Sequence, residues 1–286
     1  MYFLLYKKAQ LDFFGGHMLR SFIKLLTRYT PRVQKALAFI YHECRFNLSR
    51  ILLSCRYSEL QIIRYKDIEI ENQHKQGFQS QFGQDFFIEQ RFFKYQKKGT
   101  FVDIGCNHPK IMNNSFFFEK KGWTGLAFDP IATYKSLWEK NRKAIFLSFA
   151  LGAKKSLQSF TEIKNEGGWR NRMSGLSKNV RHEDKQYGYR TYKVSVERGT
   201  SIFYKYRLKK NIDFVSIDVE GSEMDVIQGF DMPTFLPRVI LIENCRGLSG
   251  EKSIRNFLIK KGYIFYARIW CTDDVFFHPK YIQPII

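Results

Sequence analysis

The chain has 286 residues, of which 44% are hydrophobic and 17% aromatic, so it can bury a sizeable core and is not disordered throughout. With 47 Lys and Arg against 27 Asp and Glu, its formal net charge of +20 favours polyanionic partners without specifying a fold. Its five cysteines lie far apart and include no C-x-x-C pair, which argues against a disulfide framework or structural zinc site and favours a cytoplasmic location.

Residues 1–77 form a predicted basic, mainly helical extension. Up to Lys66, twelve Lys or Arg stand against three acidic residues. Apolar residues recur at helical spacing between Leu19 and Leu26, and a second helix is expected from Val33 to about Leu53. These helices could simply pack on the main domain with solvated basic faces. Alternatively, they could bind an anionic membrane surface peripherally. We do not expect a nucleic-acid partner.

The sequence predicts neither a membrane-spanning helix nor a secretory signal peptide at the start of the chain. The apolar run Met1–Tyr6 ends at Lys7, well short of the roughly 18 apolar residues that a membrane span needs. Met18 directly precedes the first amphipathic stretch, so the true start codon could be Met1 or Met18.

Residues 78–286 form the predicted main domain, in which short apolar runs alternate with segments of helix length. Strands are expected at 101–105, 125–129, 144–150, 212–218 and 238–243, and helices at 113–122, 132–143, 222–229 and 252–262. This alternation predicts an α/β fold with a doubly wound, mostly parallel sheet. Two final runs, Tyr263–Trp270 and Val275–His278, predict a C-terminal antiparallel hairpin.

A glycine turn follows the first strand of this sheet. Asp103, Gly105 and Asn107 lie at its carboxyl end, where open parallel sheets bind ligands. Asp129 ends the next strand, 26 residues after Asp103, where a carboxylate can accept hydrogen bonds from both hydroxyls of a ribose. Together they predict a nucleoside-containing cofactor, although an ordinary strand-to-helix turn is the simpler alternative.

The residues after Gly105 distinguish between cofactors. A dinucleotide site needs G-x-G-x-x-G, but the second and third glycines are absent here. S-adenosylmethionine has no phosphate and needs only one close glycine, polar groups and the ribose acid. A reversed terminal strand fits the same choice, so we favour S-adenosylmethionine.

Seven motifs occur in a fixed order between Ser80 and His278. They are SQFGQD (80–85), FVDIGCN (101–107), NS (114–115), KGWTG (121–125), SGL (174–176), IDFVSIDVEGSE (212–223) and ILIE (240–243). In this order they resemble the motifs of FkbM-type methyltransferases. The resemblance implies a Rossmann-like class I fold and S-adenosylmethionine-dependent methylation, usually of a hydroxyl on a sugar, glycan or related small molecule.

The resemblance also implies roles for individual residues. Asp103, Gly105 and Asn107 match the cofactor turn, and Asp129 matches a position that is more often Glu in the family. His108-Pro109 departs from the commoner Asp-Gly and resembles a His-Pro branch of the family. His108 is a candidate base, with capping of the loop as the alternative.

Asp218 and Glu220 match an acidic pair at the end of the fourth strand, facing the cleft. With Glu243 they are the candidates for the base that methyl transfer to oxygen requires. Adjacent carboxylates repel one another, and a divalent metal with oxygen ligands would relieve that repulsion. For Glu220 the alternative is a structural charge at a helix N-terminus, and for Glu223 that interpretation is preferred.

The polar loop 165–172 is the expected source of an active-site lid. Ser174 and Arg172 are therefore candidates for substrate or cofactor contact, together with Glu243. Basic residues between Lys178 and Lys210 could meet an anionic glycan or phosphate, or form only a charged face.

We therefore expect a cytoplasmic enzyme that methylates oxygen on a saccharide, a glycolipid-linked saccharide or another small-molecule hydroxyl acceptor. One alternative is methylation of nitrogen or a carboxyl group on a small metabolite. The other is a non-catalytic protein that binds the cofactor or an anionic surface.

Overall fold

The computed structural model describes residues 31–57, 60–164, 170–246 and 250–285. The helix expected between Leu19 and Leu26, the Met18 start and most of the predicted lid loop lie outside these ranges. The second expected helix is confirmed as α3 (Pro31–Ser54). No helix in the described ranges is long and apolar enough to span a membrane.

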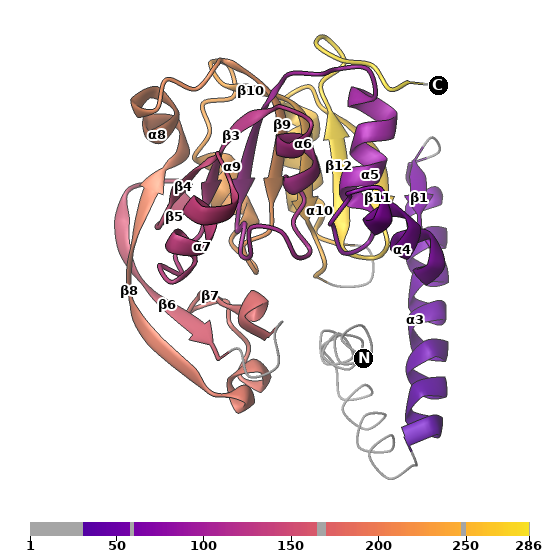
Figure 1. Cartoon of the computed structure of the whole chain (residues 1–286). Coiled ribbons are helices and arrows are strands. Elements are labelled where there is room, and N and C mark those ends of the chain that lie inside the picture. The colour runs from indigo at the N-terminus through magenta and orange to yellow at the C-terminus, as the bar shows by residue number, and fades with distance from the viewer. Residues whose placement is uncertain (1–30, 58–59, 165–169, 247–249, 286) are drawn as a thin grey trace.

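An eight-stranded sheet forms the centre of the molecule (Figure 1). In spatial order its strands are β1 (Gln61–Ile63), β11 (Ile264–Ile269), β12 (Asp273–Phe277), β10 (Leu236–Glu243), β9 (Asn211–Ile217), β2 (Thr100–Ile104), β3 (Thr124–Phe128) and β4 (Ile145–Leu147). β12 runs antiparallel to both of its neighbours, and every other pair in this sheet is parallel. The sheet is thus mixed and mostly parallel, as the alternation of strands and helices predicts.

Alternate residues of the strands face two separate cores, because successive side chains of a strand point to opposite faces. Val102, Val215 and Ile240 lie in one core with the helices α8 (Gly199–Lys205), α9 (Glu223–Gln228) and α10 (Lys252–Lys260). Phe101 and Phe214 lie in the other, against α5 (Gln84–Ile88), the π-helical turn Glu89–Phe93 and α6 (Phe116–Lys120). Helices therefore cover both faces, which leaves the carboxyl ends of the strands for ligands.

A second, four-stranded sheet is the main feature that the sequence does not predict. Its order is β5 (Ala150–Gly152), β8 (Tyr189–Arg198), β6 (Ser156–Ile163) and β7 (Gly175–Leu176). β6 and β8 form a long antiparallel pair that extends beyond the main sheet (Figure 1). The strand expected at 144–150 is wrong in its extent: β4 ends at Leu147, and Ala150 already belongs to the second sheet.

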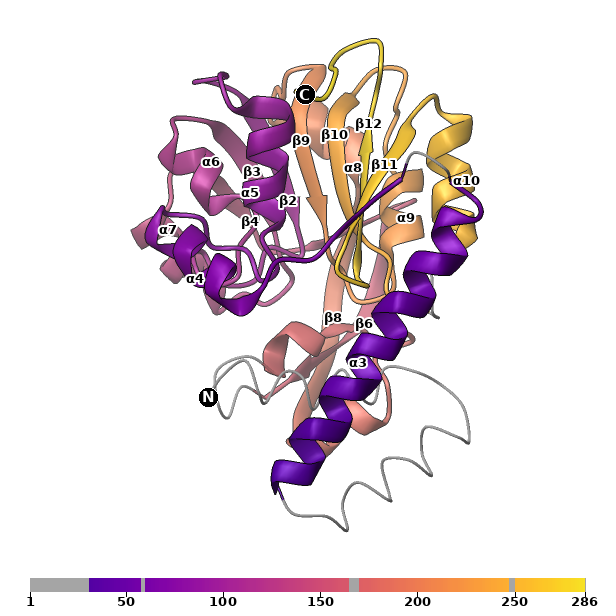
Figure 2. The same cartoon turned by 90° about the vertical axis from the view of Figure 1, so that its right-hand side faces the viewer.

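The segment before residue 78 is connected to the sheet. β1 pairs in parallel with β11, and α4 (Asp67–Lys75) follows it. Phe46 of α3 packs against Trp270, with ring centroids 5.9 Å apart. Both views show α3 projecting from the same end of the molecule as β6 and β8 (Figures 1 and 2). A boundary between residues 77 and 78 stays a prediction.

Candidate active site

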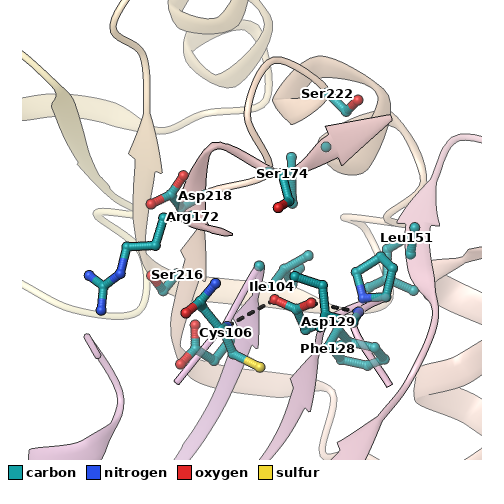
Figure 3. Close-up of a pocket in the computed structure, with 18 of the residues that line it drawn as sticks. Ile104, Cys106, Phe128, Asp129, Leu151, Arg172, Ser174, Ser216, Asp218 and Ser222 are labelled. Carbon is teal, nitrogen blue, oxygen red and sulfur yellow. Dashed lines mark hydrogen bonds between the residues drawn. The ribbon is translucent and has the colours of Figure 1, made fainter. Parts of the chain in front are cut away.

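A cavity lies beyond the carboxyl ends of β2, β3 and β9, and β7 closes one side of it (Figure 3). Its walls enclose about 870 Å³ of space, part of it open to solvent. We call it the first cavity.

Gly105 brings two backbone segments together at the floor of this cavity. Its φ of 79° is left-handed, and a Cβ built on it would lie 1.6 Å from the carbonyl oxygen of Asp218. The amides of Gly105 and Cys106 both donate to the carbonyl oxygen of Phe128, at 2.9 and 3.1 Å. Any side chain at this position would push β2 and β9 apart, so the turn requires glycine.

Asp129 directly follows β3, and both of its carboxylate oxygens accept hydrogen bonds (Figure 3). Oδ2 accepts a hydrogen bond from the amide of Asn107 at 3.0 Å, and Oδ1 accepts one from the amide of Ile131 at 2.8 Å. Burial raises the pKa of Asp129 to about 7, although these two donors lower it. Each oxygen keeps a second acceptor position, so the carboxylate can still receive hydroxyl donors from a ligand.

Asp103 and Asn107 hold the surrounding loops in place. Asp103 accepts hydrogen bonds from Asn113 Nδ2 at 3.1 Å and Ser115 Oγ at 2.6 Å. Oδ1 of Asn107 accepts from the hydroxyl of Tyr134 at 2.9 Å, and its backbone has a left-handed φ of 45°. Both residues line the first cavity, but their side chains are engaged with the protein.

His108 turns toward its own loop. Its Nδ1 accepts hydrogen bonds from the amides of Lys110 and Ile111, at 3.1 and 2.9 Å. Burial lowers the pKa of His108, and the charges of Arg172 and Lys110 lower it further. These contacts support the loop-capping alternative, and a role as base stays a prediction.

Three carboxylates meet where β9 and β10 end. Asp218, Glu220 and Glu243 each place an oxygen within 4.8 Å of the others, and we call them the acidic trio. Glu220 has a left-handed φ of 54°, and this strained backbone directs it toward the trio. The sequence predicts these three residues as candidates, and the fold brings them together.

Burial, and after it nearby negative charge, raises the pKa values of the acidic trio. Desolvation of its carboxyl group raises the pKa of Asp218 to about 7, and the negative charges of Asp273 and Glu223 raise it as well. The pKa values of Glu220 and Glu243 are raised further, first by burial and next by the charge of Asp218. The three carboxyl groups therefore hold protons more tightly than ordinary carboxylates do.

Glu223 differs from the trio. Its carboxylate accepts hydrogen bonds from the amides of Gly221 at 2.8 Å and Val219 at 3.2 Å, at the start of α9. This geometry agrees with the structural interpretation of Glu223.

The methyltransferase FkbM domain matches residues 103–265, which is more than half of the chain. The chain belongs to the FkbM methyltransferase family. Neither a curated protein nor a solved structure matches it in the same comparisons. The family implies a class I methyltransferase fold, and the large, mostly parallel sheet agrees with it.

Ser174 and Arg172 line the first cavity of this FkbM domain, and their contact with substrate or cofactor stays a prediction. Ser174 Oγ accepts a hydrogen bond from the amide of Ile163 at 2.9 Å, which fixes its position. Arg172 donates to the carbonyl oxygen of Ile111 at 2.8 Å, and its charge lowers the pKa of Asp218. The two residues therefore connect the second sheet to the site.

A second cavity lies beside the acidic trio. Glu220 and Glu243 line it, whereas Asp218 lines the first cavity, so the trio lies between the two. Lys178, Arg181 and Arg246 also line the second cavity. The sequence gives only an indirect signal for two of them, because Lys178 and Arg181 fall within its basic cluster. Arg246 has no such signal.

Proposed function

We propose that this FkbM methyltransferase transfers the methyl group of S-adenosylmethionine to a hydroxyl oxygen of a saccharide or glycolipid-linked saccharide. The observation that carries the proposal is the acidic trio between two cavities. One cavity has the glycine turn and buried carboxylate that a nucleoside needs, and the other has room for an acceptor.

The residues of the first cavity fit the cofactor. Gly105 lets the turn after β2 pass close to the backbone of Asp218, and Asp129 can accept hydrogen bonds from ribose hydroxyls. Bound there, S-adenosylmethionine supplies an electrophilic methyl group. Arg172 and Ser174 are candidates for contact with its polar end or with the acceptor.

The acidic trio supplies the base. Transfer to oxygen forms a C–O bond, breaks the S–C bond and releases the hydroxyl proton, which a carboxylate of the trio accepts. Because burial and repulsion raise these pKa values, an ionised member of the trio binds a proton more readily than an ordinary carboxylate. The trio also orients the acceptor by hydrogen bonding to its hydroxyl.

Binding of a divalent cation is an alternative role for the acidic trio, because three carboxylates are suitable oxygen ligands. Acidic groups at such spacing are common without a metal. Transfer measured after dialysis against a chelator, and again after adding back Mg²⁺ or Mn²⁺, decides between a proton acceptor alone and a metal site.

The first experiment is calorimetric titration of the full chain with S-adenosylmethionine and S-adenosylhomocysteine. Stoichiometric binding of both supports the cofactor assignment. Transfer of a labelled methyl group is then compared among hydroxyl, amine and carboxyl acceptors. Transfer only to an amine or carboxyl group contradicts the O-methylation proposal, and cofactor binding without transfer to any acceptor favours the non-catalytic alternative.

We further propose that α3 binds an anionic membrane at its cytoplasmic face. Ile40, Leu48, Ile51 and Leu52 are 43–57% exposed, and Cys44 and Cys55 continue their row at helical spacing. Arg50 and Arg56 are exposed beside this row. Apolar residues flanked by basic ones are typical of interfacial helices.

A further inference from the structure

The second cavity has an unusual lining for a small-molecule site. Its described residues include no aromatic side chain, and Ile254 is its only large aliphatic one. Most small-molecule sites are instead lined mainly by hydrophobic and aromatic side chains. Charged and amide groups dominate here, so the occupant must be strongly polar.

Two of its cations are held in place by one carboxylate each. Lys178 Nζ lies 3.1 Å from Asp225 Oδ2, and Arg246 Nη1 lies 3.5 Å from Glu251 Oε1. Both side chains remain about half exposed. A lysine has three donors and an arginine five, so one ion pair leaves each with capacity for a ligand.

Arg246 is also connected to the turn that carries the acidic trio. Its Nη2 donates to the carbonyl oxygen of Gly221 at 3.3 Å. A Cβ at Gly221 would lie 2.1 Å from that nitrogen, and the φ of Gly221 is 98°. Glycine at this position therefore lets the guanidinium lie against the backbone next to Glu220.

Carboxylates and cations therefore share one cavity. Glu220 and Glu243 present the proposed proton acceptors, while Lys178, Arg181 and Arg246 present positive charge. The charge of Arg181 lowers the otherwise raised pKa of Glu220, so this cation acts electrostatically on that carboxylate. An occupant that satisfies both sets of groups has a hydroxyl at one place and a negative charge at another.

We propose, on the basis of the proposed function, that the second cavity is the acceptor site and that its acceptor carries an anionic group near the methylated hydroxyl. Phosphate and carboxylate share this chemistry, since both accept charge-assisted hydrogen bonds from lysine and arginine. A sugar phosphate and a uronic acid are the two sources to distinguish.

The test measures anion binding to the full chain that is saturated with S-adenosylhomocysteine. The probes are glucose 1-phosphate, glucuronate and glucose, titrated separately. We expect at least one anionic probe to bind at least tenfold more tightly than glucose. The difference between the two anions then identifies phosphate or carboxylate as the preferred group.

Matched variants assign the binding to the second cavity. Lys178→Gln and Arg246→Gln should each weaken the preferred anion about tenfold. Lys155→Gln and Arg190→Gln are the controls, because Lys155, just before β6, and Arg190, on β8, are exposed cations with one carboxylate partner each, at 3.1 and 2.9 Å. The controls should bind like the parent chain.

Two results would overturn the proposal: glucose binding as tightly as both anions, or the control variants losing as much affinity as the cavity variants. S-adenosylhomocysteine binding is recorded for every variant. If the parent chain does not bind S-adenosylhomocysteine, the proposed function itself is contradicted. If it binds S-adenosylhomocysteine but shows no preference for anions, only the inference about the second cavity is contradicted.

Discussion

The α-carbon of Gly105 and the carbonyl oxygen of Asp218 approach so closely that a Cβ on the glycine would lie 1.6 Å from that oxygen. The contact connects the end of β2, where the cofactor turn begins, to the end of β9, where the acidic trio begins. The turn and the proposed base are therefore positioned by one backbone contact.

Gly105→Ala should lower the free energy of unfolding by about 2–4 kcal/mol, because the new methyl group overlaps Asp218 and the φ is left-handed. Denaturant unfolding measures this effect. Gly122→Ala is the control: its φ is 106°, but the nearest atom to its Cβ would be 3.5 Å away. An equal loss in both variants would mean that φ alone, and not the contact with Asp218, determines the cost.

Asp129→Ala should weaken S-adenosylmethionine binding about 10–100-fold, because the carboxylate that would receive the ribose hydroxyls is removed. Calorimetry measures the affinity, and thermal unfolding checks that the chain still folds. Asp129→Asn keeps the shape of the side chain but places an amide group against two backbone donors. This variant should therefore also bind S-adenosylmethionine more weakly than the parent chain. Unchanged affinity in a folded Ala variant would refute the ribose assignment.

Asp218→Asn should reduce methyl transfer about 10²–10⁴-fold while leaving the affinity for S-adenosylhomocysteine within a few-fold, because the group removed acts as a proton acceptor. In the parent chain, transfer should rise with pH up to about 7, where Asp218 ionises. A parent rate that stays flat from pH 5 to 8 would count against a carboxylate base.

The same carboxyl makes stability depend on pH. Its pKa is raised from 3.8 to about 7 in the folded chain, so the folded state binds this proton more tightly than the unfolded state. That contribution is complete below 3.8 and is lost as the pH rises to about 7. Between pH 4 and 8 the Tm of Asp218→Asn should therefore fall less than that of the parent chain, as thermal unfolding can measure.

His108→Ala separates the two roles of this histidine. If Nδ1 only caps the loop, transfer should fall less than about tenfold, and the main loss should be in KM for the cofactor. A base would instead cost about 10²–10⁴-fold in kcat. Steady-state kinetics distinguishes the two, and an Asn substitution, which can also accept an amide hydrogen bond, should recover the capping effect.

Leu48→Ser with Ile51→Ser should reduce flotation of the full chain with vesicles that contain anionic lipid, because the apolar row on α3 is interrupted. Neutral vesicles should bind weakly in every case. Leu157→Ser removes an apolar residue that is 67% exposed on β6 and serves as the control. Flotation that is insensitive to the α3 substitutions would refute this surface.

Local patterns could be predicted from the sequence where one segment determines the structure. The apolar run ending at Gly105 specifies β2, and the alternation of strands and helices specifies the parallel order. The third strand was mispredicted because the apolar run continues through Phe149, but the amide of Phe149 donates to the carbonyl oxygen of Leu147 and turns the chain.

The second sheet and the second cavity depend on pairing between distant segments. β6 ends at Ile163 and β8 begins only at Tyr189, with β7 between them, and neither has a continuous apolar run. Arg246, which follows the end of β10, donates a hydrogen bond to the turn at Gly221, which follows the neighbouring strand β9. No local pattern indicates such contacts, which is why the acidic trio could be predicted, whereas Lys178 and Arg181 had only the indirect signal of the basic cluster and Arg246 had none.

The pairing of β1 with β11 affects how the N-terminal part can be removed. β1 covers the hydrogen-bonding edge of β11, so cutting the chain at residue 77 would leave that edge open. An uncovered edge strand invites pairing with a second molecule. A shortened protein that begins just before Gln61 keeps the edge closed, and any change in its membrane binding then reports on α3 rather than on self-association.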